Sequence, residues 1–289
     1  MPLHRPHSTT RSPGGYFYTQ ADGTAGASGL GYVVSDADGI PFLSFYQQSG
    51  GPAEWGYPVS HRFIYQGFTV QIFQKAGFQW NPAAGGISFL NIFDLLHEQG
   101  FDPQLQAQYS VPPPVPWPQD SGQPFSVVVQ NHLAVLEANP ALRAAFLANP
   151  NWLNINGLPM APIATYGNVA VLRAQRAVYQ QWLQAMPWAA AGQVTVANGG
   201  DVAKTLGLWP AWAVAPALSP AGAALGDDRS ARSPADGDPQ PPGLRRGRAD
   251  HLPPAYPCPR PAGDHPGDFG APDSEREPGG PEQPPISRE

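Results

Sequence analysis

An internal repeat constrains the fold of this chain more than any other feature of its sequence. When the sequence is shifted by 101 residues, positions 56–79 align without a gap on positions 157–180, and 7 of the 24 aligned pairs are identical. The identical pairs are Gly56/Gly157, Pro58/Pro159, Tyr65/Tyr166, Val70/Val171, Gln74/Gln175, Ala76/Ala177 and Gln79/Gln180. Each copy of a repeat folds as one supersecondary unit, so both stretches are expected to share one succession of elements.

A second block of matches follows at an offset of 107 residues, so copy two carries six extra residues around positions 184–191. The matched pairs are Gly85/Gly192, Asn91/Asn198, Asp94/Asp201, Gly100/Gly207 and Pro103/Pro210. The two blocks occur in the same order in both copies. We therefore interpret residues 51–103 and 152–210 as two divergent copies of one module.

The shared positions predict a β-hairpin with one further strand. Residues 68–73 alternate between apolar and polar side chains, as in a half-buried strand. The Lys-Ala-Gly step at 75–77 is typical of a tight reversal, and residues 78–80 form the returning strand. Residues 87–90 and 194–197 each predict a short additional strand.

A short helix is expected after the last strand of each module. Asp94 and Asp201 stand where an N-cap is needed, because a carboxylate there accepts the free amides of the first helical turn. Gly100 and Gly207 follow six residues later as C-terminal caps. Since capping explains both aspartates, we favour it over a catalytic role for them.

The expected fold class is α+β, with two β-hairpin-plus-short-helix modules joined by a Pro-rich spacer and a helical segment. Pro and Trp fill the spacer, and such a segment adopts an extended conformation. The expected organisation is a disordered N-terminus (1–15), module 1 (16–110), the spacer (111–124), a helical segment with module 2 (125–217) and a disordered tail (218–289).

Outside the repeat, four segments carry signals of regular structure. Residues 125–138 look helical, and the Asn-Pro pair at 139–140 places a capping residue before a proline that begins a second helix, over 141–148. Residues 32–34 and 42–46 are expected to form a lead-in strand and helix of copy one.

Residues 218–289 differ from the rest of the chain in composition. Pro, Gly, Arg and Asp dominate there, and apolar residues are sparse. Such a segment cannot bury enough surface to offset the entropy lost on ordering. We expect a disordered tail, or an out-of-frame extension of a GC-rich gene, and the sequence leaves both readings open.

The charge distribution argues against nucleic acid as a partner. The net charge is −6, of which the tail contributes −4, and nucleic-acid binding needs a basic surface instead. Lys75 and Lys204 are the only lysines, so a polybasic membrane contact is not expected either.

Several other classes of protein also fit the sequence poorly. The only cysteine is Cys258, in the tail, so the body offers no disulfide or thiol nucleophile. The first 15 residues lack the apolar core of a signal peptide, and no stretch approaches the ~20 apolar residues of a membrane span. We find no nucleotide-binding or hydrolase motif, and we expect no cofactor, no metal and no integral membrane segment.

Two stretches of module 1 resemble a pattern found in uncharacterised exported bacterial proteins. A Gly-Gly pair and a Trp-Gly-Tyr-Pro step occur within residues 50–60, and Val-Gln-Ile-Phe-Gln-Lys follows at 70–75. Residues 175–182 and 192–201 are similar to the second half of the same proteins, so the resemblance covers about residues 30–212.

The pattern is also distantly similar to the LGFP repeat of cell-wall-associated proteins. This chain departs from that repeat, because it has Trp-Gly-Tyr-Pro at 55–58 and Asn-Gly-Leu-Pro at 156–159 where the repeat has Leu-Gly-x-Pro, and because it has only two copies. The resemblance implies an exported, envelope-facing or extracellular protein, often an accessory to enzymatic domains. It supplies no catalytic residues.

Aromatic side chains around the two hairpins are the candidate ligand-binding residues. Flat aromatic rings with neighbouring glutamines stack on sugar rings or bind peptides. The alternative is that they fill the cores of the modules, which have few aliphatic residues. The candidates are Trp55, Tyr57, Tyr65, Trp80, Tyr179, Trp182 and Trp188.

Two other polar groups were weighed as sites. Asp94, His97 and Glu98 share one face of a helix and are the only cluster that suggests metal or acid–base chemistry, although a capped surface helix explains them as well. The Gln-Lys and Gln-Arg pairs at 74–75 and 175–176 suit an anionic glycan, but we favour the reading that they are the solvated turns of the hairpins.

We therefore expect a non-catalytic binding or structural protein of the cell envelope, or a secreted one. Its expected partner is a cell-wall glycan such as a polysaccharide or peptidoglycan, or a surface protein. Two alternatives stay open, an accessory domain or enzyme of an unrecognised hydrolase type that uses Asp94, His97 or Glu98, and a scaffold that only spaces its partners.

Overall fold

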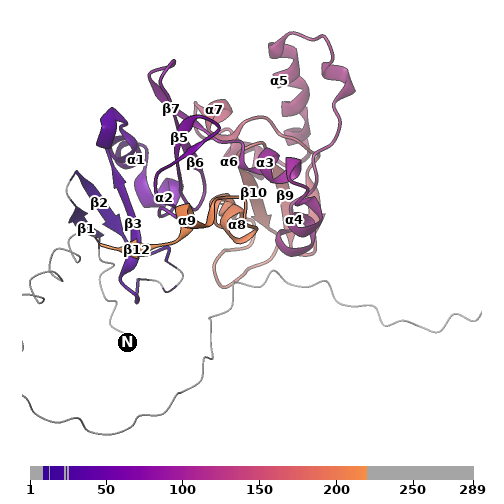
Figure 1. Cartoon of the computed structure of the whole chain (residues 1–289). Coiled ribbons are helices and arrows are strands. Elements are labelled where there is room, and N and C mark those ends of the chain that lie inside the picture. Colours follow the sequence, from indigo (N-terminus) through magenta and orange to yellow (C-terminus); the bar gives the residue numbers. More distant parts are fainter. Residues whose placement is uncertain (1–8, 13, 23, 25, 220–289) are drawn as a thin grey trace, which may run out of the picture. The chain divides into compact units, whose positions relative to one another are not determined.

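The structure is a computed structural model that describes residues 9–219, except residues 13, 23 and 25. The disorder expected for residues 1–8 and 220–289 concerns segments outside the described residues. Within the described range, no helix is both long and apolar enough to cross a membrane. The architecture is α+β, as the sequence predicts (Figure 1).

Module 1 contains a four-stranded antiparallel sheet whose strands follow one another in chain order, β4-β5-β6-β7. The predicted hairpin lies at its centre, where Val70 pairs with Gln79 and Ile72 with Gly77. One short helix precedes the sheet and another follows it. The elements are α2 (Gly51–Trp55), β4 (Phe63–Tyr65), β5 (Phe68–Ile72), β6 (Gly77–Asn81), β7 (Gly86–Phe89) and α3 (Ile92–Glu98).

Module 2 repeats this succession of elements, with its four strands in the same order. The helix and the first three strands lie 101 residues after their equivalents, and the final helix lies 107 residues after its equivalent, as the sequence alignment predicts. The elements are α7 (Trp152–Asn156), β8 (Ala164–Tyr166), β9 (Val169–Arg173), β10 (Val178–Trp182), β11 (Val194–Val196) and α8 (Gly199–Thr205).

The first strand of each sheet, β4 in module 1 and β8 in module 2, is not predicted by the sequence. Each has only three residues, of which the middle one is exposed and one or two are half-buried. A strand of this length carries too few residues for an alternation of apolar and polar positions to be recognised.

The two modules contact each other through equivalent residues. The Gly200 amide of module 2 donates to the Gln74 carbonyl of module 1 at 2.8 Å, and the Phe93 amide of module 1 donates to the Gln175 carbonyl of module 2 at 3.1 Å. Each atom pair is thus reproduced with the roles of the modules exchanged, which defines an isologous interface. The modules are therefore related by an approximate twofold axis within one chain.

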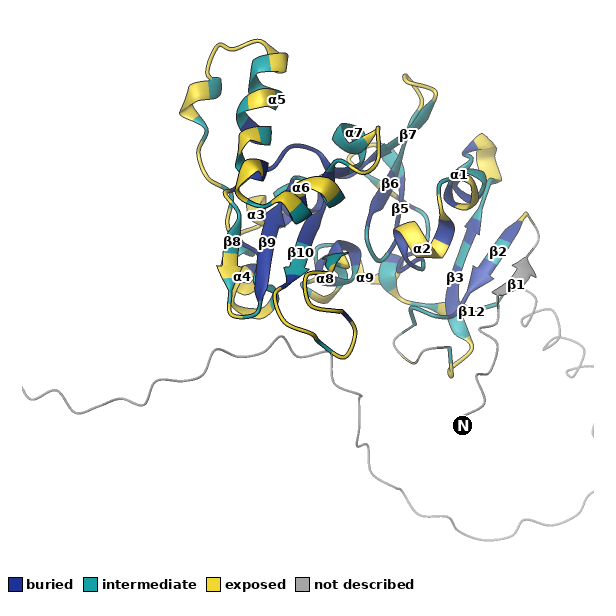
Figure 2. Cartoon of the chain, turned by 180° about the vertical axis from the view of Figure 1, so that it is seen from behind, coloured by how far each residue is buried: buried dark blue, intermediate teal, exposed yellow. Residues whose placement is uncertain are grey.

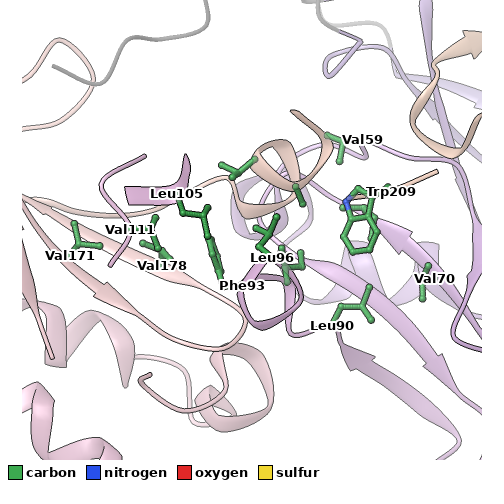
Figure 3. Close-up of a cluster of buried hydrophobic side chains, with 14 of the residues drawn as sticks. Val59, Val70, Leu90, Phe93, Leu96, Leu105, Val111, Val171, Val178 and Trp209 are labelled. Carbon is green, nitrogen blue, oxygen red and sulfur yellow. The ribbon is translucent and has the colours of Figure 1, made fainter. Parts of the chain in front are cut away.

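The largest hydrophobic core lies between the modules. β5 contributes Val70 and Ile72 to it and β9 contributes Val171, because alternate side chains of a strand share one face. Figure 3 shows Phe93 and Leu96 of α3 between Val171 on one side and Val70 on the other. Burial of this shared core stabilises the pairing of the two modules.

The outer face of each sheet is covered by a helix that precedes the repeat. In module 1 this helix is α1 (Phe42–Gln48), and the core beneath it is aromatic, with Trp55 stacked on Phe89 at 5.1 Å between ring centroids. In module 2 it is α6 (Pro140–Phe146), which packs on smaller side chains such as Ala170. Figure 2 shows β9 and β10 largely buried between these layers.

A third sheet joins the two ends of the described chain, in the order β1-β2-β3-β12. The lead-in strand and helix that we expected are confirmed as β3 and α1. β1 lies inside the segment 1–15, so the disorder expected there is wrong for residues 9–12, and Leu218 lies in β12 rather than in the tail. The elements are β1 (Thr9–Ser12), β2 (Gly15–Tyr18), β3 (Leu30–Ser35), η1 (Ala37–Gly39), α9 (Ala211–Val214) and β12 (Ala217–Leu218).

The segment between the modules is helical where the sequence predicts it. Asn139 is the N-cap of α6, where its side chain accepts a hydrogen bond from the Leu142 amide at 3.0 Å. The spacer is tied to module 2, since the Val115 amide donates to the Met160 carbonyl at 2.9 Å. The other elements are α4 (Asp102–Tyr109), η2 (Pro118–Asp120), α5 (Phe125–Leu133) and η3 (Ala134–Ala138).

The predicted helix caps are right at one end of α3 and α8 and wrong at the other. Gly100 and Gly207 adopt φ values of +79° and +76° just after the helices, as C-terminal caps do. The N-cap positions, however, are held by Asn91 and Asn198, three residues before the two aspartates. Asp94 and Asp201 therefore stand one turn inside the helices, and they bind other groups.

Candidate functional site

The glutamine shared by both copies links the two modules. The Gln74 side chain donates through Nε2 to the Asp201 carboxylate at 3.1 Å, and Gln175 donates in the same way to Asp94 at 3.1 Å. Each glutamine also accepts, through Oε1, from a backbone amide of its own module at 3.0 Å. These glutamines lie in the hairpin turns, as predicted, but their side chains are half-buried and bridge the modules, so the expectation that they are solvated is wrong.

The two aspartates of these bridges are partly withdrawn from water. Burial raises the pKa of Asp94 and the pKa of Asp201, and in each case the hydrogen bond from the glutamine partly offsets this effect. Their role in the interface between modules explains why both copies retain them. Neither is placed as a catalytic group.

The structure does not bring Asp94, His97 and Glu98 together as an acid–base or metal site. His97 and Glu98 are exposed, and the His97 Nδ1 atom contacts the Asp102 carboxylate at 2.5 Å, on the following helix. Across residues 9–219, as far as they are described, no group of three His, Cys, Asp or Glu residues is arranged to hold a metal ion. This arrangement gives the hydrolase alternative no support.

Asp102 also holds a buried cation that the sequence analysis did not single out. The Arg173 side chain is fully buried in the interface between modules, where it contacts Asp102 at 3.1 Å. It further donates to the carbonyls of Pro112 and Phe93 at 2.9 and 2.7 Å. The equivalent position in module 1 is Ile72, so the ion pair is a feature of module 2 alone.

Most of the predicted aromatic residues fill cores, which was the alternative reading of them. Trp55, Tyr179 and Trp182 are buried, and the polar atom of each ring system is bonded to Ser49, Asn156 and Thr195 respectively. Tyr65 and Trp80 are half-buried and pack against hydrophobic cores.

Of the two remaining predicted residues, Trp188 keeps an exposed ring and Tyr57 is half-buried. Trp188 is 48% exposed and touches only the edge of Trp182, at 5.6 Å between centroids. Tyr57 is half-buried and lies 6.3 Å from Tyr18, a residue that the sequence analysis did not consider. Tyr18 lines an aromatic groove that is open to solvent.

Three tyrosines line a groove between the N-terminal sheet and the helices of module 1. Tyr16 and Tyr18 come from β2, where they are two residues apart and so share one face of the strand. Tyr46 comes from α1, and its ring meets the edge of Tyr18 at 5.7 Å and 82°. We call this feature the tyrosine groove. Its volume is about 450 Å³, and it opens to solvent.

The rest of the tyrosine groove is polar backbone and small residues. Gln47 follows Tyr46 on α1 and is exposed, while Gly50 is the N-cap of α2 and Gly51 and Pro52 are its first two residues. The two glycines bring no side chain into the groove, and of its three tyrosines Tyr16 is the one whose ring is partly exposed. This glycine pair belongs to the stretch that resembles exported bacterial proteins.

The hydroxyl groups of the tyrosine groove differ in their availability. Tyr46 donates to the Gly56 carbonyl at 2.7 Å, which fixes its ring, whereas Tyr18 makes no side-chain hydrogen bond to another described residue. Burial, with smaller contributions from Tyr16 and Tyr57, raises the pKa of Tyr18 to about 12. Tyr18 therefore stays protonated at neutral pH and can donate a hydrogen bond to a ligand.

The sequence indicates only part of this groove. The Tyr-Phe-Tyr alternation at 16–18 predicts two tyrosines on one face of a strand. Nothing in the sequence indicates that Tyr46 of a later helix closes the same groove. The sequence predicts ligand binding at the hairpins of the repeat, whereas the groove is formed by residues that precede the hairpins.

No protein-family model matches this chain, and no curated protein matches it. The resemblance to LGFP repeats and to exported bacterial proteins therefore stays a prediction. The assignment of the site rests on the geometry of the described residues.

Proposed function

We propose that this chain is a non-catalytic binding protein of the bacterial envelope or cell exterior, and that its tyrosine groove binds a polysaccharide or the glycan strands of peptidoglycan. The observation that carries this proposal is the groove lined by Tyr16, Tyr18 and Tyr46, in which Tyr16 presents a partly exposed ring above the buried rings of the other two. Aromatic rings stack on the apolar faces of sugar rings, and nearby polar groups orient the sugar hydroxyls.

The composition of the tyrosine groove favours a neutral, extended ligand over a charged one. Tyr16, Tyr18, Tyr46 and Gln47 are uncharged at neutral pH, and the remaining lining residues are Gly50, Gly51 and Pro52. A glycan chain meets these requirements, because it offers flat faces and hydroxyl groups along its length. The openness of the groove to solvent also suits a polymer, which must continue past both ends of its binding site.

The proposed location rests on the resemblance of residues 50–60 and 70–75 to exported bacterial proteins. The non-catalytic assignment rests on two points. The sequence contains no recognised catalytic motif, and the titratable groups of the interface, Asp94, Asp102 and Arg173, are bound to protein partners. A pure scaffold is less well supported, because it has no need of exposed aromatic rings such as Trp188 and Trp212.

A retention assay on insoluble glycans tests the proposal. The full chain is mixed with purified bacterial cell wall, chitin and cellulose, and the bound fraction is measured. We expect retention on at least one of them. Tyr16→Ala and Gln47→Ala are expected to reduce it, the first by about fivefold to tenfold if one sugar contact of about 1–1.5 kcal/mol is lost.

Trp188→Ala is the matched control, since it removes an exposed aromatic ring from the other module. It is expected to leave retention unchanged. Absence of retention on all three materials would count against glycan binding. Retention that depends on Trp188 and not on Tyr16 would move the site to module 2 and refute the assignment to the tyrosine groove.

A further inference from the structure

The helix α5 is anchored to the rest of the chain by a histidine. All residues of α5 are described, and His132 is the one among them that is buried, whereas Phe125 at the start of the helix is exposed. Figure 1 shows that α5 projects beyond the sheet of module 2. The deepest contact of this helix is therefore made by a polar ring and not by an apolar side chain.

Both ring nitrogens of His132 face hydrogen-bond acceptors. Nε2 lies 2.7 Å from the Asp120 carboxylate of the spacer, and Nδ1 contacts the carbonyl of Pro159, in the Gly-x-Pro turn of module 2. A neutral imidazole has one N–H group and one acceptor nitrogen, whereas an imidazolium has two N–H groups. Only the imidazolium can donate to both partners, so the surroundings of His132 match its charged form.

Two neighbouring groups also favour a positive charge on this ring. The Asn131 side chain donates to the other oxygen of Asp120 at 2.7 Å. This bond, and to a smaller extent the one from His132, lowers the pKa of Asp120, so its carboxylate is ionised at neutral pH. The indole of Trp117 stacks on His132 with 3.8 Å between ring centroids and 19° between planes, and the face of an indole attracts cations.

The elements that pack around α5 supply one counter-charge. Residues 111–133 contain no titratable side chain besides Asp120 and His132, and the turn of module 2 at 156–163 contains none. Glu137 of η3 is exposed and pairs with Arg143 at 3.2 Å. Among the described residues, Asp120 is therefore the carboxylate that balances His132.

From this geometry we infer that His132 is the centre of a pH-sensitive clamp, which fastens the spacer and α5 to module 2 while the ring carries two protons. Loss of one proton leaves a ring nitrogen whose lone pair faces an acceptor, so the contact with either Asp120 or Pro159 must break. A buried acceptor without a donor destabilises the closed arrangement. Because the closed state binds the proton more tightly than the open state, the clamp is closed at lower pH and opens as the pH rises.

Nuclear magnetic resonance of the full, isotope-labelled chain tests the charge of the ring directly. Spectra that correlate ring protons with ring nitrogens distinguish an imidazolium from an imidazole with a single N–H group. Contacts with the ring protons of Trp117 identify the signals of His132. We expect both nitrogens of His132 to be protonated at about pH 7, where most free histidine is neutral, and one of them to lose its proton at higher pH.

Hydrogen exchange of the α5 amides measures the opening of the clamp. After correction for the intrinsic exchange rate, their protection is expected to fall by about tenfold as the pH rises from about 6 to about 8.5. His132→Gln has no proton to lose, so its protection is expected to be lower and independent of pH. Asp120→Asn removes the counter-charge and keeps an acceptor oxygen, so it is expected to shift the opening to lower pH by about one unit. His97→Gln is the control, since it alters another contact between a histidine and a carboxylate, and it is expected to leave α5 unchanged.

Three results would overturn the inference. One is a His132 ring with a single protonated nitrogen at about pH 7, and another is an opening that Asp120→Asn does not shift. The third is a loss of protection with pH that is the same in His132→Gln as in the unaltered chain, which would place the titrating group elsewhere. If His132→Gln does not fold, the ring spectra and Asp120→Asn still decide. None of these results bears on retention by glycans, so the two proposals succeed or fail separately.

Discussion

Modules 1 and 2 have the same backbone fold and differ in the side chains that form their cores. Both have the same succession of elements, and the same glutamine and aspartate bridge the interface in both directions. Under its covering helix, module 1 has an aromatic core around Trp55 and Phe89, whereas the equivalent positions of module 2 are Asn156 and Val196. The residues that persist are those that set turns and join the modules.

Position 72 and its equivalent 173 give the sharpest contrast. Ile72 is a buried apolar residue, and Arg173 is a fully buried cation with an ion pair to Asp102. Both face the same interface core. The comparison teaches that the approximate twofold axis is kept by backbone and bridge contacts, while the chemistry on either side of it has diverged.

The largest effect is expected from Arg173→Ile, which gives module 2 the residue of module 1. The Asp102 carboxylate would lose its buried cation, and the Phe93 and Pro112 carbonyls would lose a donor. Removal of one partner of a buried ion pair costs about 3–5 kcal/mol. Urea unfolding of the variant is expected to give a free energy of unfolding lower by about 3 kcal/mol or more.

Arg143→Ala is the control for that measurement. Arg143 pairs with Glu137 at 3.2 Å, and both side chains are more than half exposed. Its loss is expected to cost at most about 0.5 kcal/mol. If Arg173→Ile costs no more than this control, the ion pair contributes nothing and the two modules are interchangeable at this position.

A smaller and symmetric effect is expected from Gly56→Ala and Gly157→Ala. The two residues have φ values of +73° and +70°, and a Cβ on either would lie 2.5 or 2.7 Å from the Cβ of Gln74 or Gln175. Both the left-handed backbone and the close approach penalise alanine, so each variant is expected to lose about 2–4 kcal/mol.

Gly100→Ala separates the two contributions, because Gly100 has φ +79° and open space where its Cβ would lie. It is expected to cost only the backbone share, about 1–2 kcal/mol. Thermal unfolding of the three variants provides the comparison. Unequal losses for Gly56→Ala and Gly157→Ala would contradict the equivalence of the two turns.

The two interface bridges are expected to contribute about equally. Double-mutant cycles on Gln74 with Asp201, and on Gln175 with Asp94, isolate the coupling of each pair. Each coupling energy is expected to be about 0.5–1.5 kcal/mol, the range for a hydrogen bond in a protein. A coupling energy near zero for one pair only would contradict the expectation that both bridges stabilise the interface.

The smallest effect concerns pH. Burial raises the pKa of Asp94 above its ordinary value of 3.8, so the native state binds this proton more tightly than the unfolded state does. The contribution of Asp94 to stability is therefore greatest at low pH and falls as the pH rises through the interval between the ordinary and the raised pKa.

Asp94→Asn removes this titration and keeps an oxygen that accepts the hydrogen bond from Gln175. The stability of the variant relative to the unaltered protein is expected to be more favourable at pH 7 than at pH 3. Asp201→Asn is expected to behave in the same direction, since burial raises the pKa of Asp201 too. Urea unfolding at both pH values measures the difference, and the opposite sign in both variants would refute the assignment.

The fold of the modules was predictable because the glycines that mark turns and helix ends occur at the positions that the alignment of the two copies makes equivalent. Gly56, Gly157, Gly100 and Gly207 mark turns and helix ends, and the offset between copies ties each strand to its equivalent. The third sheet was not predictable. Its last strand has only two residues, and it pairs with a strand that lies more than 180 positions earlier in the chain.

The functional features were less accessible from the sequence. Aromatic residues of the hairpins looked like a binding surface, yet Trp55 and Tyr179 are needed to fill space between layers. Composition does not distinguish a core aromatic from an exposed one. The tyrosine groove depends on the meeting of β2 and α1, and that contact follows from tertiary packing.

The pairing of β12 with β3 has a consequence for how the chain acquires its structure. Leu218 lies beside Leu30, so the N-terminal sheet receives its fourth strand only after both modules have been synthesised. Tyr32 reinforces this late contact through its hydroxyl, which donates to the Val214 carbonyl at 2.6 Å. The first three strands pair with one another, and the last strand of the described chain completes the sheet. In this sheet, β1 and β12 are separated by three strand spacings, about 15 Å. A short linker could therefore join Thr9 to Leu218 in a circular permutant.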